Sequence, residues 1–177
     1  MQDIAFIDLI NGGYCVVDAD MFPILNAEGW TRTAENRIAQ TTNRYIRGSG
    51  RKNQKCITVL MHRFVNQTPE GIGTDHINGL PWDNRRCNLR TATNPQNHWN
   101  QRKRKGEYSS KYKGVYLSHR PGRRDKWVAQ ICYMGKSRAL GPFLNEEDAA
   151  RRYDQEAVKV FGEFANLNFP TSPPWRA

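Results

Sequence analysis

The stretch from Asp75 to Asn97 constrains the fold more than any other part of the chain. It begins with an adjacent acid and imidazole, Asp75 and His76, passes through the turn-forming pair Asn78-Gly79, and continues to Asn88 and Asn97. Consecutive residues of a strand point to opposite faces, so both side chains of the first pair reach one site only where the chain bends. We therefore predict a strand, a turn, a second short strand and a helix from about residue 94, an order that brings Asn97 back beside Asp75.

These residue types suit the hydrolysis of a phosphodiester bond. That reaction needs a base that activates water and a divalent cation that stabilises the developing charge. A neutral His is suited to the first role near neutral pH. Asp and Asn oxygens are hard ligands, and Mg²⁺ accepts about one or two protein ligands, with water and substrate phosphate completing its shell. The pattern therefore favours a metal-dependent nuclease.

The same residues and intervals resemble those of the HNH nuclease family over residues 55–101. The resemblance implies that His76 is the general base, that Asp75 and Asn97 are metal ligands, and that Asn88 holds the hairpin and orients His76. Many members have His where this chain has Asn97. An oxygen ligand at that position favours Mg²⁺ or Mn²⁺ over Zn²⁺. The alternative is that these residues are ordinary surface pairs and turn formers.

Four further residues are secondary candidates for this site. His62 is expected either to pack internally or to contact a phosphate or a metal-bound water. Arg63, Arg85 and Arg90 are candidates for phosphate contacts, with an internal partner as the alternative for Arg90.

Positive charge is concentrated just after this stretch. Of the net charge of +10, residues 1–97 hold 11 Lys and Arg against 9 Asp and Glu, whereas residues 98–138 hold 12 against 2. Such a concentration indicates a polyanionic partner. The densest part is the run Arg102, Lys103, Arg104 and Lys105, which we interpret as a linker that also follows a nucleic-acid backbone.

From residue 111 the pattern changes to that of a second small domain. Three runs typical of strands lie at residues 112–116, 126–131 and 137–141, with turns at Pro121-Gly122 and Met134-Gly135. A helix is predicted next, with Asn145 as its N-cap and Gly162 just beyond its last turn. Its apolar residues recur on one stripe, which predicts that this face packs against the sheet.

Several motifs in this region resemble the plant ethylene-response-factor (Apetala-type) DNA-binding domain over residues 112–170. They are Y-K-G-V, K-W-V-A-Q-I, L-G-P-F, E-E-D-A-A-R-R-Y-D-Q-E-A and the closing A-N-L-N-F-P. That family lays its sheet in the major groove, so the resemblance implies double-stranded DNA as the partner. Tyr116 and Ala139 stand where Arg and Trp are usual, and the plant target sequence is therefore not expected. The residues at strand or turn positions suited to DNA contacts are Lys113, Tyr116, Arg124, Lys126, Trp127, Gln130 and Arg138, with a place in the core as the alternative for Trp127.

The remaining signals complete an α+β architecture. Short apolar runs alternate around Asn11-Gly12-Gly13, which indicates a hairpin within a β-rich scaffold at residues 1–54. We expect this scaffold to be followed by a ββα-metal HNH nuclease at 55–101, a basic linker at 102–111, a three-stranded antiparallel sheet with one helix at 112–170, and a tail at 171–177. Scattered cysteines indicate a reducing, cytoplasmic location, and no segment reaches the roughly 18 apolar residues of a membrane span.

Taken in sequence, these features predict a site-selective DNA endonuclease of the homing type found in phages and bacteria, which either nicks DNA or cuts both strands. The alternative is a DNA-binding regulator whose HNH site has decayed. A ribonuclease or RNA-binding protein fits the charge but lacks the aromatic stacking motifs expected for single-stranded RNA. No membrane or protein partner is expected.

Overall fold

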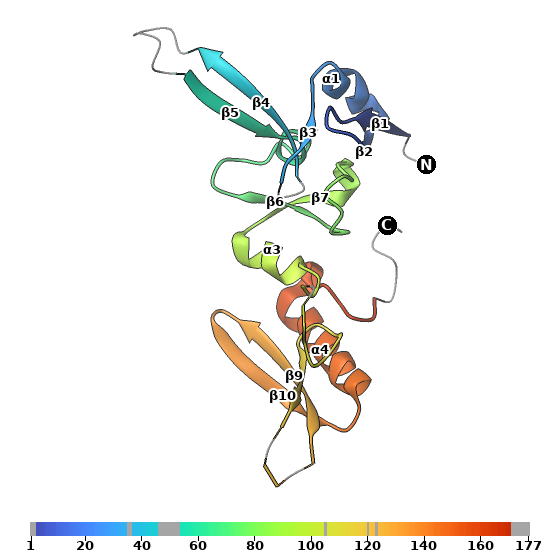
Figure 1. Ribbon diagram of the computed structural model, residues 1–177, viewed down its shortest axis with the longest axis vertical. Helices are drawn as coiled ribbons and strands as arrows, with labels where there is room; N and C mark the ends of the chain where they lie inside the picture. Colours follow the sequence, from blue (N-terminus) through green and yellow to red (C-terminus); the bar gives the residue numbers. More distant parts are fainter. Residues whose placement is uncertain are drawn as a thin grey trace. The chain divides into compact units, whose positions relative to one another are not determined.

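The computed structural model of the chain describes residues 3–34, 37–45, 54–104, 106–119, 121–122 and 124–170 (Figure 1). It divides into two compact units, Met1–Asn94 and Pro95–Ala177. Both combine small antiparallel sheets with helices, which confirms the predicted α+β class. The expected tail, residues 171–177, lies outside the described residues.

The described part of the first unit contains three small sheets joined by short helices. Strands β1 (Ile4–Asp8) and β2 (Tyr14–Asp18) form a hairpin, and β6 (Gly73–His76) pairs with β7 (Leu89–Ala92). The third sheet has the order β3 (Thr31–Arg32), β4 (Ile38–Tyr45) and β5 (Gln54–Leu60). The helical segments are η1 (Ala19–Met21), α1 (Phe22–Asn26), α2 (Met61–Val65) and η2 (Arg86–Asn88).

One hydrophobic core holds the first unit together. Ile7 of β1 and Val17 of β2 are buried in the same cluster as Met61 of α2 and Leu89 of β7. The hairpin predicted around Gly12-Gly13 is confirmed, and both glycines have positive φ angles. Because a single core crosses the boundary expected at residue 54, the β-rich segment and the β6–β7 hairpin fold as one body.

The second unit is built around a three-stranded antiparallel sheet with one long helix. Its strands β8 (Val115–Ser118), β9 (Lys126–Tyr133) and β10 (Lys136–Phe143) lie in the order β10-β9-β8. The unit also contains α4 (Glu146–Phe161), η3 (Gly162–Phe164) and most of α3 (Asn94–Asn100). None of the helices in the described ranges is long and apolar enough to cross a membrane.

Helix α4 packs on one face of this sheet, as its apolar stripe predicts. The stripe includes Ala149, Ala150, Tyr153 and Ala157, all buried in one cluster with Ala129 and other residues of the sheet. Small alanine side chains allow the helix to approach the strands closely. The helix is bounded by Asn145 and Gly162 as predicted, although the Asn145 amide donates to Asp148 rather than accepting from a backbone amide.

Candidate functional site

Asp75 lies in β6 directly opposite Arg90 of β7. Arg90 donates from Nε and from a terminal nitrogen to Oδ2 of Asp75, at 3.0 and 2.8 Å. The two side chains are only 10 and 12% exposed, so the carboxylate is charge-compensated within the hairpin. Arg90 thus has an internal partner, which was the predicted alternative to a phosphate contact.

His76 ends strand β6, and its ring contacts a loop residue that was not among the candidates predicted from the sequence. Nε2 of His76 lies 3.3 Å from Oδ1 of Asn84, which is fully buried. The backbone of Asn84 is fixed in turn, because its amide donates to the carbonyl of Val16 in β2 at 2.8 Å. When Nε2 carries the proton that it donates to Asn84, Nδ1 carries the lone pair that a general base needs.

Asn88 holds two points of the loop between β6 and β7. Its Oδ1 accepts from the backbone amide of Asn78 at 2.9 Å, and its Nδ2 donates to the carbonyl of Asp83 at 2.7 Å. Both bonds are buried. The side chain therefore braces the loop from which Asn84 contacts the His76 ring.

The structure brings a second imidazole, His62 of α2, against His76. The two rings meet edge to face with centroids 5.2 Å apart, and Nδ1 of His62 is buried without a hydrogen-bond partner. Burial, with smaller contributions from the neighbouring His76 and from Arg37 and Arg63, lowers the pKa of His62 to about 4. Burial also lowers the pKa of His76, against the opposing effects of Asn84, Asp75 and Asp83. Both rings are therefore neutral near pH 7.

The two other secondary candidates hold loops of the first unit. Arg63 donates to the carbonyls of Ile72 and Pro69, at 2.5 and 2.8 Å. Arg85 binds both oxygens of Asp83, each at 2.7 Å. Burial alone would raise the pKa of Asp83, but the hydrogen bonds and charge of Arg85 outweigh it and the pKa is lowered. Both arginines thus have internal partners, and the phosphate contacts considered from the sequence stay a prediction.

The candidate metal ligands have the chemistry of a site for a hard cation. Asp75 supplies carboxylate oxygen from the first unit, and Asn97 is a half-buried residue of α3 in the second unit. Within the described residues, no group of three or more His, Cys, Asp and Glu side chains is suited to bind a metal. Carboxylate and amide oxygens are hard donors of the kind that Mg²⁺ or Mn²⁺ prefers, whereas a Zn²⁺ site uses three or four protein ligands.

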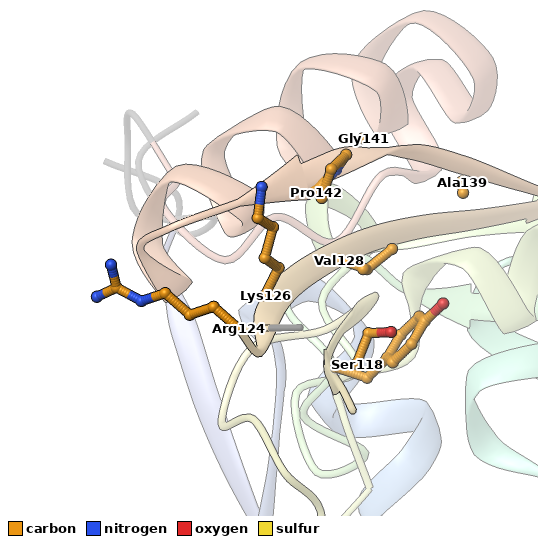
Figure 2. A pocket seen from close by; sticks show the side chains of 8 residues that line it. Ser118, Arg124, Lys126, Val128, Ala139, Gly141 and Pro142 are labelled. Atoms are coloured by element: carbon orange, nitrogen blue, oxygen red, sulfur yellow. The ribbon is translucent and has the colours of Figure 1, made fainter. Parts of the chain in front are cut away.

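In the second unit, the face of the sheet that points away from α4 carries a hollow of about 480 Å³ (Figure 2). We call this the open face. It is identified by strand alternation, since Ala129 and Ile131 are buried with α4 whereas Lys126 and Val128 have the opposite orientation. Figure 2 shows Arg124 and Lys126 extending outward beside it. The hollow is lined by Tyr116, Ser118, Arg124, Lys126, Val128, Ala139, Gly141 and Pro142.

Two residues expected to contact DNA lie on the helix side of the sheet instead. Arg138 pairs with Ile131 in the β9–β10 register, and its guanidinium binds the buried carboxylate of Glu156 in α4. Trp127 packs against the core cluster, which was its alternative place. Arg138 therefore lies on the opposite face from Lys126, which does not support the DNA contact predicted for it. Gln130 pairs with Ala139, which lines the hollow, and so belongs to the open face.

Two of the expected DNA-binding lysines also have internal partners. Lys103 donates to the carbonyls of Ser110 and Tyr112, at 2.7 and 2.8 Å. Lys113 donates to two other carbonyls of the second unit, and burial lowers its pKa to about 8 against the opposing charge of Asp154. Arg102 and Arg104 are exposed, whereas Lys105 lies outside the described residues.

Comparison with known proteins gives two kinds of similarity. The chain is 28% identical over 164 residues to an uncharacterized HNH endonuclease of Acanthamoeba polyphaga mimivirus, covering 89% of this chain and 75% of that protein. It is also 42% identical over 64 residues to APETALA2-like protein 2 of Oryza sativa subsp. indica, and 44% identical over 61 residues to an AP2-like ethylene-responsive transcription factor of Arabidopsis thaliana.

The rice match covers 36% of this chain and 14% of the rice protein. The Arabidopsis match covers 34% of this chain and 12% of the Arabidopsis protein. No protein-family model matches the chain. No solved structure matches it.

Proposed function

We propose that this protein is a metal-dependent DNA endonuclease of HNH type whose second unit binds double-stranded DNA. The observation that carries the proposal is the environment of His76, a neutral imidazole in contact with Asn84 and next in sequence to Asp75. The similarity to a mimivirus protein named as an HNH endonuclease supports the same chemistry. Site selection of the homing type is part of this proposal.

His76 is the general base in this proposal. Its Nδ1 accepts a proton from the attacking water, while Asn84 keeps the proton on Nε2 and fixes the plane of the ring. His62 packs edge to face on the same ring and restricts its rotation. Asp75 is the proposed ligand for Mg²⁺ or Mn²⁺, and Asn97 stays a predicted ligand. The bound cation would supply charge stabilisation at the phosphate and the leaving oxygen.

The open face is the proposed surface for DNA. Lys126 and Arg124 are exposed beside the hollow and are suited to phosphate contacts, whereas Tyr116 and Gln130 are suited to contacts with base edges. Exposed Arg102 and Arg104 add positive charge to the same unit. The similarity to AP2-like plant transcription factors supports DNA binding by part of this chain.

Incubation with supercoiled plasmid tests the proposed activity. We expect Mg²⁺ or Mn²⁺ to produce nicked or linear plasmid, and EDTA to abolish the reaction, because the metal stabilises charge that the chain cannot neutralise alone. The alternative, a regulator with a decayed nuclease site, predicts retarded DNA in a gel with no cleavage in either metal. Cleavage of RNA but not DNA would contradict both.

The salt dependence of binding tests the open face. If Lys126 neutralises one phosphate, Lys126→Ala should reduce the slope of log K against log salt concentration by about 0.9. Arg138→Ala is the matched control, because the Arg138 guanidinium binds Glu156 on the helix side of the same sheet. We expect its slope to equal that of the wild-type protein. Equal losses in both variants, measured by fluorescence anisotropy in EDTA, would contradict the assignment of the open face.

A further inference from the structure

Helix α3 is packed into the second unit by aromatic stacking. The ring of Trp99 stacks on Phe161 of α4, with centroids 4.9 Å apart and an angle of 17° between the planes. Tyr133 of β9 lies 5.5 Å from the same Trp99 ring. This helix is predicted from the sequence to belong to the nuclease at residues 55–101, yet its Trp99 is half-buried against the core of the second unit.

Lys113 binds the C-terminal end of α3. Its Nζ donates to the carbonyl of Trp99 at 2.6 Å and to that of Gln101 at 2.7 Å. The last carbonyls of a helix have no partner within the helix, and a cation at that end is favoured by the helix dipole. A single ammonium group therefore caps the end of α3.

The backbone of Lys113 is fixed to α4 through two further side chains. Its amide donates to Oδ1 of Asn168 at 2.7 Å, and Nδ2 of Asn168 donates to its carbonyl at 3.1 Å. The buried carboxylate of Asp154 in α4 accepts from the amide and from Nδ2 of Asn168, at 2.9 and 3.0 Å. A continuous set of hydrogen bonds thus connects α4 to the end of α3 through Lys113.

We propose that the second unit positions α3 for DNA cleavage as well as binding DNA, and that Lys113 is the positioning residue. The inference rests on the proposed function, in which Asn97 of α3 is a predicted metal ligand. Lys113 acts through the helix, because its ammonium donates to the carbonyls of Trp99 and Gln101. This role differs from the DNA contact that the sequence resemblance implies for Lys113.

Hydrogen exchange of the full-length protein, without metal or DNA, tests whether Lys113 holds the end of α3. Lys113→Met keeps most of the aliphatic stem and removes the ammonium group. We expect the amides of residues 98–101 to exchange about tenfold faster, while the amides of β9 and β10 keep their protection. Lys159→Met is the matched control, because it removes the same charge from an exposed position of α4. Its exchange in α3 should equal that of the wild-type protein.

Cleavage by the same variants tests the consequence. We expect Lys113→Met to raise the Mg²⁺ concentration for half-maximal cleavage by about 10- to 100-fold, as loss of an outer-shell support does, with DNA affinity in EDTA nearly unchanged. Lys159→Met should keep the wild-type Mg²⁺ dependence. Trp99→Leu, which removes the stacking on Phe161, should shift exchange and Mg²⁺ dependence in the same direction as Lys113→Met.

The outcomes separate this inference from the proposed function. Unchanged hydrogen exchange in Lys113→Met would contradict the claim that Lys113 holds the end of α3. Faster exchange with wild-type Mg²⁺ dependence would overturn its role in cleavage, and a loss confined to DNA affinity would assign Lys113 to DNA binding. A wild-type protein that cleaves no DNA in Mg²⁺ or Mn²⁺ would contradict the proposed function itself, and with it the role of Lys113 in cleavage.

Discussion

Replacement of His76 by Ala should lower the rate of DNA cleavage by a factor of about 10² to 10⁴, the range typical for loss of a general base. DNA binding should be nearly unchanged, because the substitution removes neither positive charge nor the open face of the second unit. The lost group is a neutral ring held by Asn84 and His62. Single-turnover cleavage in Mg²⁺ and binding in EDTA measure the two quantities separately.

His62→Gln is the control that identifies which imidazole acts as the base. His62 is 7% exposed, and Nδ1 of its ring is buried without a partner. Its loss should loosen the His76 ring and lower the rate less than His76→Ala does. If His62→Gln abolished cleavage and His76→Ala retained near-normal turnover, the roles of the two rings would be reversed.

Gly114→Ala should strongly destabilise the second unit. Gly114 has a φ of 71°, and an added Cβ would lie 2.1 and 2.2 Å from two ring carbons of Tyr153 and 2.9 Å from the carbonyl oxygen of Gln130. Overpacking of this kind, together with the positive φ, should cost about 3 kcal/mol or more. We expect a lower unfolding temperature for the second unit and weaker DNA binding, measured by calorimetry and fluorescence anisotropy.

Gly122→Ala isolates the steric part of this effect. Gly122 has nearly the same φ, 72°, but an added Cβ would meet no atom within 4 Å. The backbone penalty alone should be about 1 kcal/mol. The difference between the two variants then measures the collision with Tyr153 and the Gln130 carbonyl. Equal unfolding temperatures for Gly114→Ala and Gly122→Ala would mean that the Tyr153 ring moves aside at little cost.

Features with local causes could be predicted from the sequence. The Asn11-Gly12-Gly13 turn determines the first hairpin, because glycine accepts the positive φ angles that the turn requires. Helix α4 starts after Asn145 and ends just before Gly162, and its apolar stripe gives the face that packs on the sheet. Each of these features depends on residues close together in the chain, so composition and spacing are sufficient to find it.

Features that depend on distant partners could not be predicted in the same way. Asn84 is indistinguishable in sequence from other turn-forming asparagines, and its place beside His76 depends on a backbone hydrogen bond to Val16. The face on which Arg138 lies is set by strand register, which shifts between Ala139 and Pro142. Lys113 appears in the sequence as one more basic residue, and only the fold shows that its charge is used internally.

The division of the chain at Asn94 and Pro95 has a consequence for recombining this protein with a relative. In a chimera joined in the basic run at 102–105, Trp99 and Phe161 would come from different parent proteins. The same would hold for the end of α3 and Lys113. Helix α3 would then pack against side chains of the other parent, which are not complementary to it. A crossover at Thr93, between β7 and α3, keeps these contacts within one parent, so an exchanged second unit should be transferred together with its helix.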